Sequence, residues 1–188
     1  MVRRWWMAAG TAVVLAIASA GSVVADERYE DAVGDALGDA PDIVAVTVGE
    51  PEGPVLSLAV EFATEPPLGT DDADSDFLWI ALDTTPEVTF PELDGYAIAT
   101  MGLTLPRDLE AGSHLLVNNE LYWGVVDVAV DGPTVTFRLD RKLLGEPTDL
   151  YFRVYAAAMQ GSLYTEQTDH FPGEDEPPAH YMLSTEGD

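Results

Sequence analysis

Aromatic and arginine side chains occur at alternate positions in several short aliphatic stretches of the chain. Because successive side chains of a β-strand point to opposite faces, one face of each stretch would enter a core and the other would carry these residues. Flat aromatic rings offer apolar contact with a polar edge, and a guanidinium offers hydrogen-bond donors. A sugar ring needs both. The predicted ligand-binding residues are Trp79, Trp123, Tyr151, Tyr155, Arg138 and Arg153.

This binding prediction requires that the strands carrying the six residues be neighbours in one sheet. Trp123 is the first choice for a stacking platform, because its stretch has an aliphatic opposite face and Gly124 follows it. The alternative is that a loop or the N-terminal segment covers the rings and that the arginines pair with nearby acids, since large aromatic side chains are highly buried on average. The solvent exposure of Trp79 and Trp123 separates the two interpretations.

Aspartates recur at short intervals in the Gly- and Ala-rich segment between Asp26 and Asp42. If both ends of the chain lie together in the fold, these aspartates meet others near the C-terminus. Calcium takes about six to eight oxygen ligands and is commonly held by such loops, although the spacing of an EF-hand loop is missing. A second acidic run, at residues 71–76, is interpreted as a solvated loop. The predicted ligands of a structural Ca2+ are Asp31, Asp35, Asp42 and Asp169.

No arrangement of residues selects a catalytic site. The chain has no cysteine, which excludes a thiol nucleophile, a thiolate metal site and a disulfide framework. With 34 acidic residues, a carboxylate pair for glycoside hydrolysis has no specificity, and the adjacent Ser113 and His114 do not constitute a triad. Methionines and histidines that could ligate haem are present, but nothing in their positions selects a pair. We therefore predict a protein that is not an enzyme.

The charge balance limits the classes of partner. The chain has 34 acidic and 8 basic residues and a formal net charge of -26. A nucleic-acid-binding protein needs a basic face for phosphates, so this class is excluded, and docking on anionic lipid is disfavoured. Polyanionic ligands are repelled over long range, whereas a neutral polysaccharide or cell-surface glycan is not.

The first 25 residues have the pattern of an export signal. Arg3 and Arg4 precede an apolar stretch, and small residues lead to a predicted cleavage site after Ala25, with Ala18-Ser19-Ala20 as the second choice. The apolar stretch is short for a membrane span, which needs about 20 residues. We therefore predict a signal peptide at residues 1–25 and a secreted, extracellular mature chain at residues 26–188 with no membrane span. The mature chain then has 6 basic and 34 acidic residues, a net charge of -28.

Short apolar stretches separated by turn residues predict the elements that would position these side chains. Asp131-Gly132 favours a tight hairpin, Arg141–Leu144 favours one helical turn closed by Gly145, and the acidic segment Asp26–Asp42 is predicted as a loop. The pattern is typical of a single antiparallel β-sandwich of about eight to nine strands. The predicted strands are Ile43–Val48, Val55–Phe62, Phe77–Leu82, Tyr96–Met101, His114–Val117, Leu121–Val130, Thr134–Leu139, Leu150–Ala158 and Tyr181–Leu183.

Three stretches carry a family resemblance. They are Asp35–Ile43 (D-A-L-G-D-A-P-D-I), Leu139–Phe152 with its Leu-Gly-x-Pro turn, and Asp169-x-x-Pro172 leading to Tyr181. In these stretches the chain resembles secreted bacterial domains of the family-9 carbohydrate-binding module and DOMON-like type. The resemblance implies a jelly-roll β-sandwich with a binding role, and it adds weight to the calcium site. The Asp-Thr-Asp run of that family is only partly kept here, as Asp83-Thr84-Thr85-Pro86.

Together these features predict a secreted, non-catalytic binding domain that takes a neutral carbohydrate through an aromatic sheet face. The alternative is an acidic secreted or envelope protein that has a structural or protein-interaction role and no small-molecule ligand. In the first case the aromatic rings are open to solvent, and in the second they are packed.

Overall fold

The computed structural model describes residues 26–51, 53–66, 77–86, 96–100, 113–117, 120–123, 125–160, 163–173 and 175–184 of this chain. For residues 77, 96–100, 113–117, 120–123, 159–160 and 163–167 it describes the main chain only. The predicted signal peptide and the acidic run at 71–76 lie outside the described residues. No helix in the described part of the chain has the length and apolar character that crossing a membrane requires.

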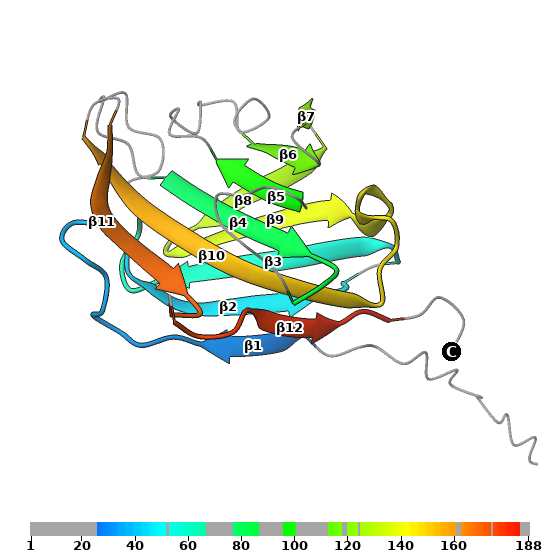
Figure 1. Ribbon diagram of the computed structural model, residues 1–188, viewed down its shortest axis with the longest axis horizontal. Helices are drawn as coiled ribbons and strands as arrows, with labels where there is room; N and C mark the ends of the chain where they lie inside the picture. The colour runs from blue at the N-terminus through cyan, green and yellow to red at the C-terminus, as the bar shows by residue number, and fades with distance from the viewer. Residues whose placement is uncertain are drawn as a thin grey trace, which may run out of the picture.

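The strands form two antiparallel β-sheets that pack face to face (Figure 1). Sheet A has five strands, and the chain leaves it after its third strand and returns to it much later. In spatial order the strands of sheet A are β1 (Glu27–Glu30), β2 (Ile43–Gly49), β3 (Val55–Phe62), β9 (Thr134–Asp140) and β8 (Val126–Asp131).

Sheet B is organised around its longest strand, β10 (Asp149–Gln160), which has 12 residues. One edge of β10 pairs with β4, while the other edge pairs with β12 along its first half and with β11 along its second half. The other strands of sheet B are β4 (Phe77–Asp83), β5 (Tyr96–Thr100), β6 (Ser113–Val117), β7 (Glu120–Trp123), β11 (Leu163–Phe171) and β12 (Ala179–Met182).

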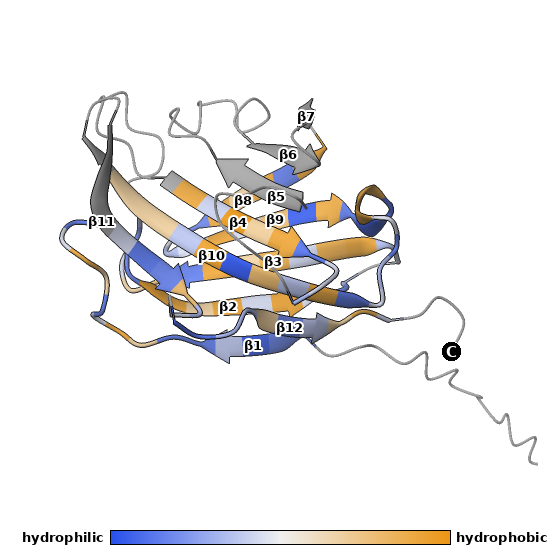
Figure 2. Ribbon diagram, in the orientation of Figure 1, coloured by the Kyte–Doolittle hydropathy of each residue, from blue (hydrophilic) through white to orange (hydrophobic). Residues whose placement is uncertain are grey.

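The core lies between the two sheets, and among the described residues it is built mainly from the alternate apolar residues of β3, β4, β9 and β10, an alternation that Figure 2 shows along β3 and β10. Burying each large aliphatic or aromatic side chain contributes about 1.5–3 kcal/mol relative to leaving it exposed. Sheet A contributes Leu56, Leu58, Val60, Phe62, Val135, Phe137 and Leu139, and sheet B contributes Leu78, Ile80, Leu82, Leu150, Phe152, Val154 and Ala156.

These observations confirm the predicted antiparallel β-sandwich, and they correct three local predictions. Strand β1 lies inside the segment predicted as a loop, and β11 occupies a polar stretch for which no strand was predicted. The predicted single strand Leu121–Val130 is two strands, because β7 belongs to sheet B and β8 to sheet A. Accordingly Val126 is buried, at 4% exposure, whereas Val130 is 38% exposed rather than part of the core.

Two turn predictions are confirmed. Asp131 pairs with Thr134 across a two-residue loop whose first residue, Gly132, has a φ of 56°. The predicted helical turn is a 3-10 helix, η2 (Arg141–Leu144), and it ends at Gly145 with a φ of 78°. These left-handed values favour glycine, which has no Cβ to clash.

The two ends of the described chain lie at the same edge of the sandwich, where β1 and β12 are side by side in Figure 1. The Tyr29 hydroxyl of β1 donates a hydrogen bond of 2.6 Å to the carbonyl oxygen of His180 in β12. The Tyr29 ring also packs edge-on against Phe152 and Phe171, at centroid distances of 5.3 and 6.3 Å. The short β1 strand is therefore anchored to sheet B as well as to sheet A.

Candidate functional site

Five of the six predicted ligand-binding residues stand in sheet B. On β10, Tyr151, Arg153 and Tyr155 alternate with buried core residues, and Trp79 does the same on β4. Tyr155 is the register partner of Trp79, and residues directly opposite in an antiparallel pair share one face of the sheet. These four residues therefore lie on the outer face of sheet B, which we call the aromatic face.

A single register row crosses the aromatic face through Tyr155 and Trp79. Adjacent strands are about 4.8 Å apart, so the row from β10 to β7 covers roughly 19 Å over four strand spacings. Trp123 stands at the β7 end of this row, while its side chain lies outside what the structure describes. From β11 to β7 the row contains His170, Tyr155, Trp79, Ala99, His114 and Trp123.

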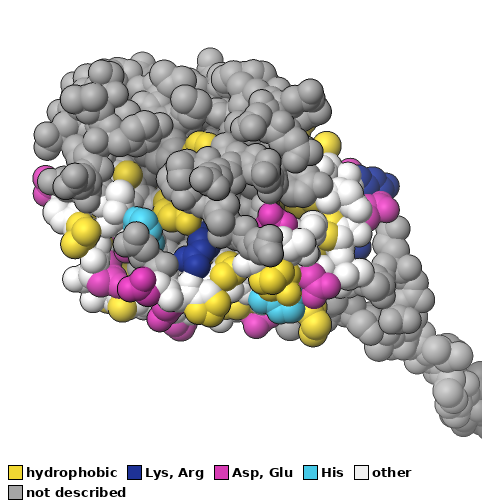
Figure 3. Space-filling view, in the orientation of Figure 1, with side chains coloured by type: hydrophobic (Ala, Val, Ile, Leu, Met, Phe, Trp, Pro, Cys, Tyr) yellow, Lys and Arg dark blue, Asp and Glu magenta, His cyan; other side chains and the backbone are white. Residues whose placement is uncertain are grey.

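Ring contacts order the part of the aromatic face around β10. Tyr151 stacks on His180, with ring centroids 4.5 Å apart and an interplanar angle of 15°. Tyr155 meets His170 edge-on at 4.9 Å. Figure 3 shows two histidine patches on this face, with a basic patch between them. Trp79, Tyr151 and Tyr155 are half-buried residues, and the indole nitrogen of Trp79 is buried.

Polar contacts hold the two histidines of this face. His180 Nε2 lies 2.9 Å from Asp149 Oδ1, and this hydrogen bond lowers the pKa of Asp149 below its usual value. His170 Nε2 lies 2.9 Å from the hydroxyl of Thr168. Each tyrosine of β10 thus has a neighbouring imidazole whose orientation is set by a hydrogen bond.

Arg153 is engaged with the loop between β11 and β12. Its Nη1 donates to the carbonyl oxygen of Gly173 at 3.5 Å, and its Nη2 donates to the carbonyl oxygen of Glu176. The predicted role of Arg153 was to donate hydrogen bonds to a ligand. In the structure its guanidinium instead holds this loop beside the aromatic face, so the loop forms one wall of that face.

Arg138 does not belong to the aromatic face, which corrects the prediction that all six residues share one surface. It lies on β9 in sheet A, where its register partners are Ser57 and Asp127. Alternation along β9 places Arg138 opposite the core residues Phe137 and Leu139, so it points outward from the far side of the sandwich. The outward orientation agrees with the sequence pattern, but alternation cannot tell which of two sheets a strand joins.

His170 and His180 are residues of the aromatic face that sequence reasoning missed. Both stand on strands in the polar C-terminal region, where Thr168 and His170 alternate with the buried residues Asp169 and Phe171. The signal that could have found them is the same alternation, with Ala179 and Tyr181 buried around His180. Strand β11 was not predicted because Asp169, a charged residue, occupies a buried position where an apolar residue is expected.

The structure brings three of the four predicted metal-ligating aspartates together. Carboxylate oxygens of Asp35, Asp42 and Asp169 lie within 4.8 Å of one another. Asp35 is exposed, Asp42 is half-buried and Asp169 is buried at 4% exposure. Loop residues 31–42 reach this position because Leu37 N–H donates to the Thr168 carbonyl oxygen of β11 at 3.1 Å.

Main-chain hydrogen bonds hold two of these carboxylates. Asp169 accepts from the N–H groups of Ile43, at 2.5 Å, and His170, at 2.9 Å. Asp42 accepts from Gly34 N–H with both of its oxygens, at 3.0 and 2.9 Å. The carboxylates are therefore fixed in place by the backbone rather than by basic side chains.

Asp31 lies at the border of this cluster. Its Oδ1 accepts from Ala32 N–H at 3.0 Å, while its Oδ2 is buried with no hydrogen-bond partner among the described residues. Burial, together with the charges of Asp169 and Asp35, raises the pKa of Asp31 to about 6 against the opposing hydrogen bond from Ala32. Burial also raises the pKa of Asp169, although its two backbone hydrogen bonds oppose this.

Carboxylates gathered at this distance repel one another, and either protons or a cation can relieve the repulsion. The three-residue cluster offers a cation carboxylate oxygens from a loop and from β11, which are the hard ligands that Ca2+ prefers.

Comparison of the chain with protein-family models, curated proteins and solved structures found no match. The residues of the aromatic face and of the aspartate cluster therefore carry the functional argument.

Proposed function

We propose that this chain is a secreted, non-catalytic binding domain whose aromatic face contacts a neutral carbohydrate. The observation that carries the proposal is the register row through Tyr155 and Trp79, which aligns half-buried aromatic residues across neighbouring strands. Stacking of sugar rings on such side chains combines apolar contact with polar edges. Trp123, at the β7 end of the row, is the further stacking residue.

Charge supports a neutral rather than an anionic ligand. The mature chain would carry a net charge of -28, and long-range repulsion lowers the association rate and affinity of polyanions. The guanidinium of Arg153 is occupied by loop carbonyl oxygens, so it offers little to a ligand carboxylate or sulfate. His170 and Tyr155 supply ring edges and polar atoms that suit hydroxyl groups.

A glycan and polysaccharide screen with the mature protein tests the proposal, followed by calorimetry on each ligand found. Trp123→Ala and Tyr155→Ala are each expected to lose about 2 kcal/mol of binding or more, as central aromatic residues of an interface do. Their Tm is expected to change little. Arg138→Ala is the matched control, because Arg138 lies on the opposite sheet and its loss leaves carbohydrate binding unchanged.

Two results contradict this proposal. If no neutral glycan binds, the aromatic face has no carbohydrate role. If Trp123→Ala unfolds at a much lower temperature and no ligand is found, the face is packed, and a structural or protein-interaction role takes its place.

We also propose that a structural Ca2+ binds at Asp35, Asp42 and Asp169, with Asp31 beside it. The support is the placement of three carboxylates within 4.8 Å of one another by loop 31–42 and β11. A cation that binds only the folded chain stabilises it by RT ln(1 + [L]/Kd). It would also fasten the N-terminal loop to sheet B.

Thermal unfolding separates specific calcium binding from simple screening. We expect millimolar CaCl2 to raise Tm more than NaCl of the same ionic strength does. Asp35→Asn should remove this excess, and it should fold because Asp35 is exposed. Asp131→Asn, in the β8–β9 hairpin, should keep it. Equal shifts from the two salts would show that screening alone acts and that the cluster holds no specific cation.

A further inference from the structure

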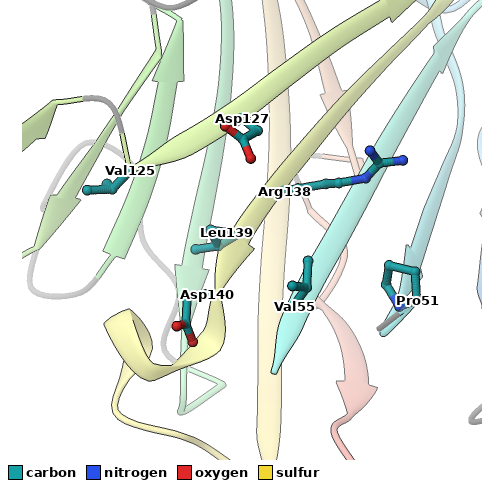
Figure 4. A pocket seen from close by; sticks show the side chains of 7 residues that line it. All are labelled: Pro51, Val55, Val125, Asp127, Arg138, Leu139 and Asp140. Atoms are coloured by element: carbon teal, nitrogen blue, oxygen red, sulfur yellow. The ribbon is translucent and has the colours of Figure 1, made fainter. Parts of the chain in front are cut away.

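A second candidate site lies on the side of the molecule that carries Arg138. There the structure contains a cavity of about 550 Å3, within the range of small-molecule sites. Its walls come from the loop after β2, the start of β3, the strand pair β8 and β9, and the residue before η2, as Figure 4 shows. The lining residues are Pro51, Val55, Val125, Asp127, Arg138, Leu139 and Asp140.

Arg138 differs from the other described arginines in its contacts. Arg28 pairs with Glu30 and Glu61, Arg141 pairs with Glu50, and Arg153 donates to loop carbonyl oxygens. Within the described part of the chain, no hydrogen bond or ion pair reaches the exposed guanidinium of Arg138. In a molecule with 34 acidic residues, such a guanidinium beside a cavity is an available donor group.

Asp127 is the complementary group. It is the register partner of Arg138, yet no ion pair joins the two, and in Figure 4 the guanidinium extends across β3 away from the Asp127 carboxylate. Asp127 is exposed and, among the residues that the structure describes, none donates to its carboxylate. The donor and the acceptor therefore face the cavity separately instead of neutralising each other.

The remaining lining residues define what could lie between these two groups. Pro51, Val55 and Val125 supply apolar walls, while the side chain of Leu139 points into the core. Asp140 adds a second carboxylate whose Oδ1 already accepts from Lys142 N–H at 2.9 Å. The lining thus has one cationic and two anionic groups. A purely anionic ligand would be repelled by the two carboxylates and by the net negative charge of the whole chain. An ammonium group is attracted by the carboxylates and by the net charge.

We propose that this cavity binds a short peptide, or a similar amphipathic zwitterion, through its two charged ends. The ammonium group pairs with Asp127, the carboxylate accepts hydrogen bonds from Arg138, and an apolar side chain packs against Val55 and Pro51. A guanidinium is well matched to a carboxylate because it donates two parallel hydrogen bonds. The proposal is independent of the carbohydrate site, which lies on the other sheet.

The probe is the dipeptide Ala-Leu, titrated into the 15N-labelled protein while amide chemical shifts are followed. We expect saturable shifts at Val55, Asp127 and Arg138. Arg138→Gln and Asp127→Asn should each weaken binding about tenfold, which corresponds to about 1.4 kcal/mol. Arg28→Gln and Asp131→Asn are the matched controls in sheet A and should leave the affinity unchanged.

Blocked peptides assign each end of the ligand. N-acetyl-Ala-Leu, which has no ammonium group, should bind the native chain more weakly than Ala-Leu does, and Asp127→Asn should not lower its affinity further. Ala-Leu amide, which has no carboxylate, should also bind the native chain more weakly, and Arg138→Gln should not lower its affinity further. The proposal is overturned if Ala-Leu gives no saturable shifts at the cavity, if the acetylated peptide binds as well as the free one, or if a neutral oligosaccharide saturates the same amides instead.

Discussion

Glu50 and Arg141 form an ion pair that is almost completely buried, with 3% and 7% of their side chains exposed. Ser184 completes the contact, since its N–H donates to Glu50 Oε1 at 2.7 Å and its hydroxyl to Oε2 at 2.6 Å. The pair joins the end of β2, the first residue of η2 and the segment after β12. It thus links three parts of the chain that are remote in sequence.

Glu50→Ala should destabilise the fold strongly, because it leaves the Arg141 charge buried without its partner. We expect a loss of about 3–5 kcal/mol in the free energy of unfolding, measured by urea denaturation. The control is Glu30→Ala, which removes an exposed pair with Arg28 (70% and 44% exposed) and should cost about 0–1 kcal/mol. Equal losses in the two variants would contradict the role assigned to the buried pair.

Asp31→Asn should stabilise the protein at neutral pH. The pKa of Asp31 is raised from 3.8 to about 6 by burial and by the charges of Asp169 and Asp35, against a hydrogen bond from Ala32. Because this pKa is higher in the folded chain than in the unfolded one, Asp31 favours folding at low pH. That contribution is lost as the pH rises from about 4 through about 6.

Thermal melting without divalent cations measures this effect. At pH 7 the Asp31→Asn variant should melt a few degrees above the native chain, and the difference should disappear below about pH 4. Asp131→Asn, an exposed change in the β8–β9 hairpin, controls for the general loss of negative charge. If it shifts Tm as much as Asp31→Asn does at both pH values, the effect belongs to net charge and not to Asp31.

Tyr29→Phe should destabilise the fold, whereas Tyr181→Phe should not. The Tyr29 hydroxyl donates to the His180 carbonyl oxygen, so its removal should cost about 1 kcal/mol. Tyr181 is 2% exposed, and its hydroxyl is buried with no hydrogen-bond partner among the described residues. Removing that hydroxyl should be neutral or stabilising by up to about 1 kcal/mol. A clear destabilisation by Tyr181→Phe in chemical denaturation would contradict this account.

Gly132→Ala should weaken the β8–β9 hairpin. At a φ of 56° a residue with a Cβ costs roughly 1 kcal/mol in backbone strain. Apart from the two neighbouring residues in the chain, nothing lies within 4 Å of the added methyl group, so no steric clash with the rest of the fold is expected. Gly132→Asn should cost less, because asparagine adopts this conformation more readily. The free energy of unfolding measures both variants, and an alanine no worse than asparagine would count against the strain argument.

Strict alternation made the central strands predictable. In β3, β4, β9 and β10 the residues that enter the core are the ones expected from the sequence, because an apolar residue recurs at every second position. In β1 only Tyr29 is even half-buried, the other three residues being exposed. A four-residue strand with a single inward residue has no periodicity to detect.

The candidate site was predictable in part for the same physical reason. Alternation shows which residues of a strand face outward, and it placed Tyr151, Tyr155 and Trp79 correctly on the side opposite the core. It does not show which strands become neighbours, so Arg138 was assigned to the wrong surface. The apolar run 121–130 hid the crossing from β7 to β8 because apolar residues continue through the point where the chain changes sheets.

The joining of the two chain ends also constrains how the molecule acquires its structure. Contacts such as Tyr29 with His180 and Glu50 with Ser184 close loops of 151 and 134 residues, and the entropy of closing such loops must be overcome before the contacts form. Topologies dominated by remote pairings fold slowly. The contacts that β12 and Ser184 make with the N-terminal part of the chain cannot form until this last segment has been synthesised, so the edge where the two chain ends meet is completed last in a growing chain.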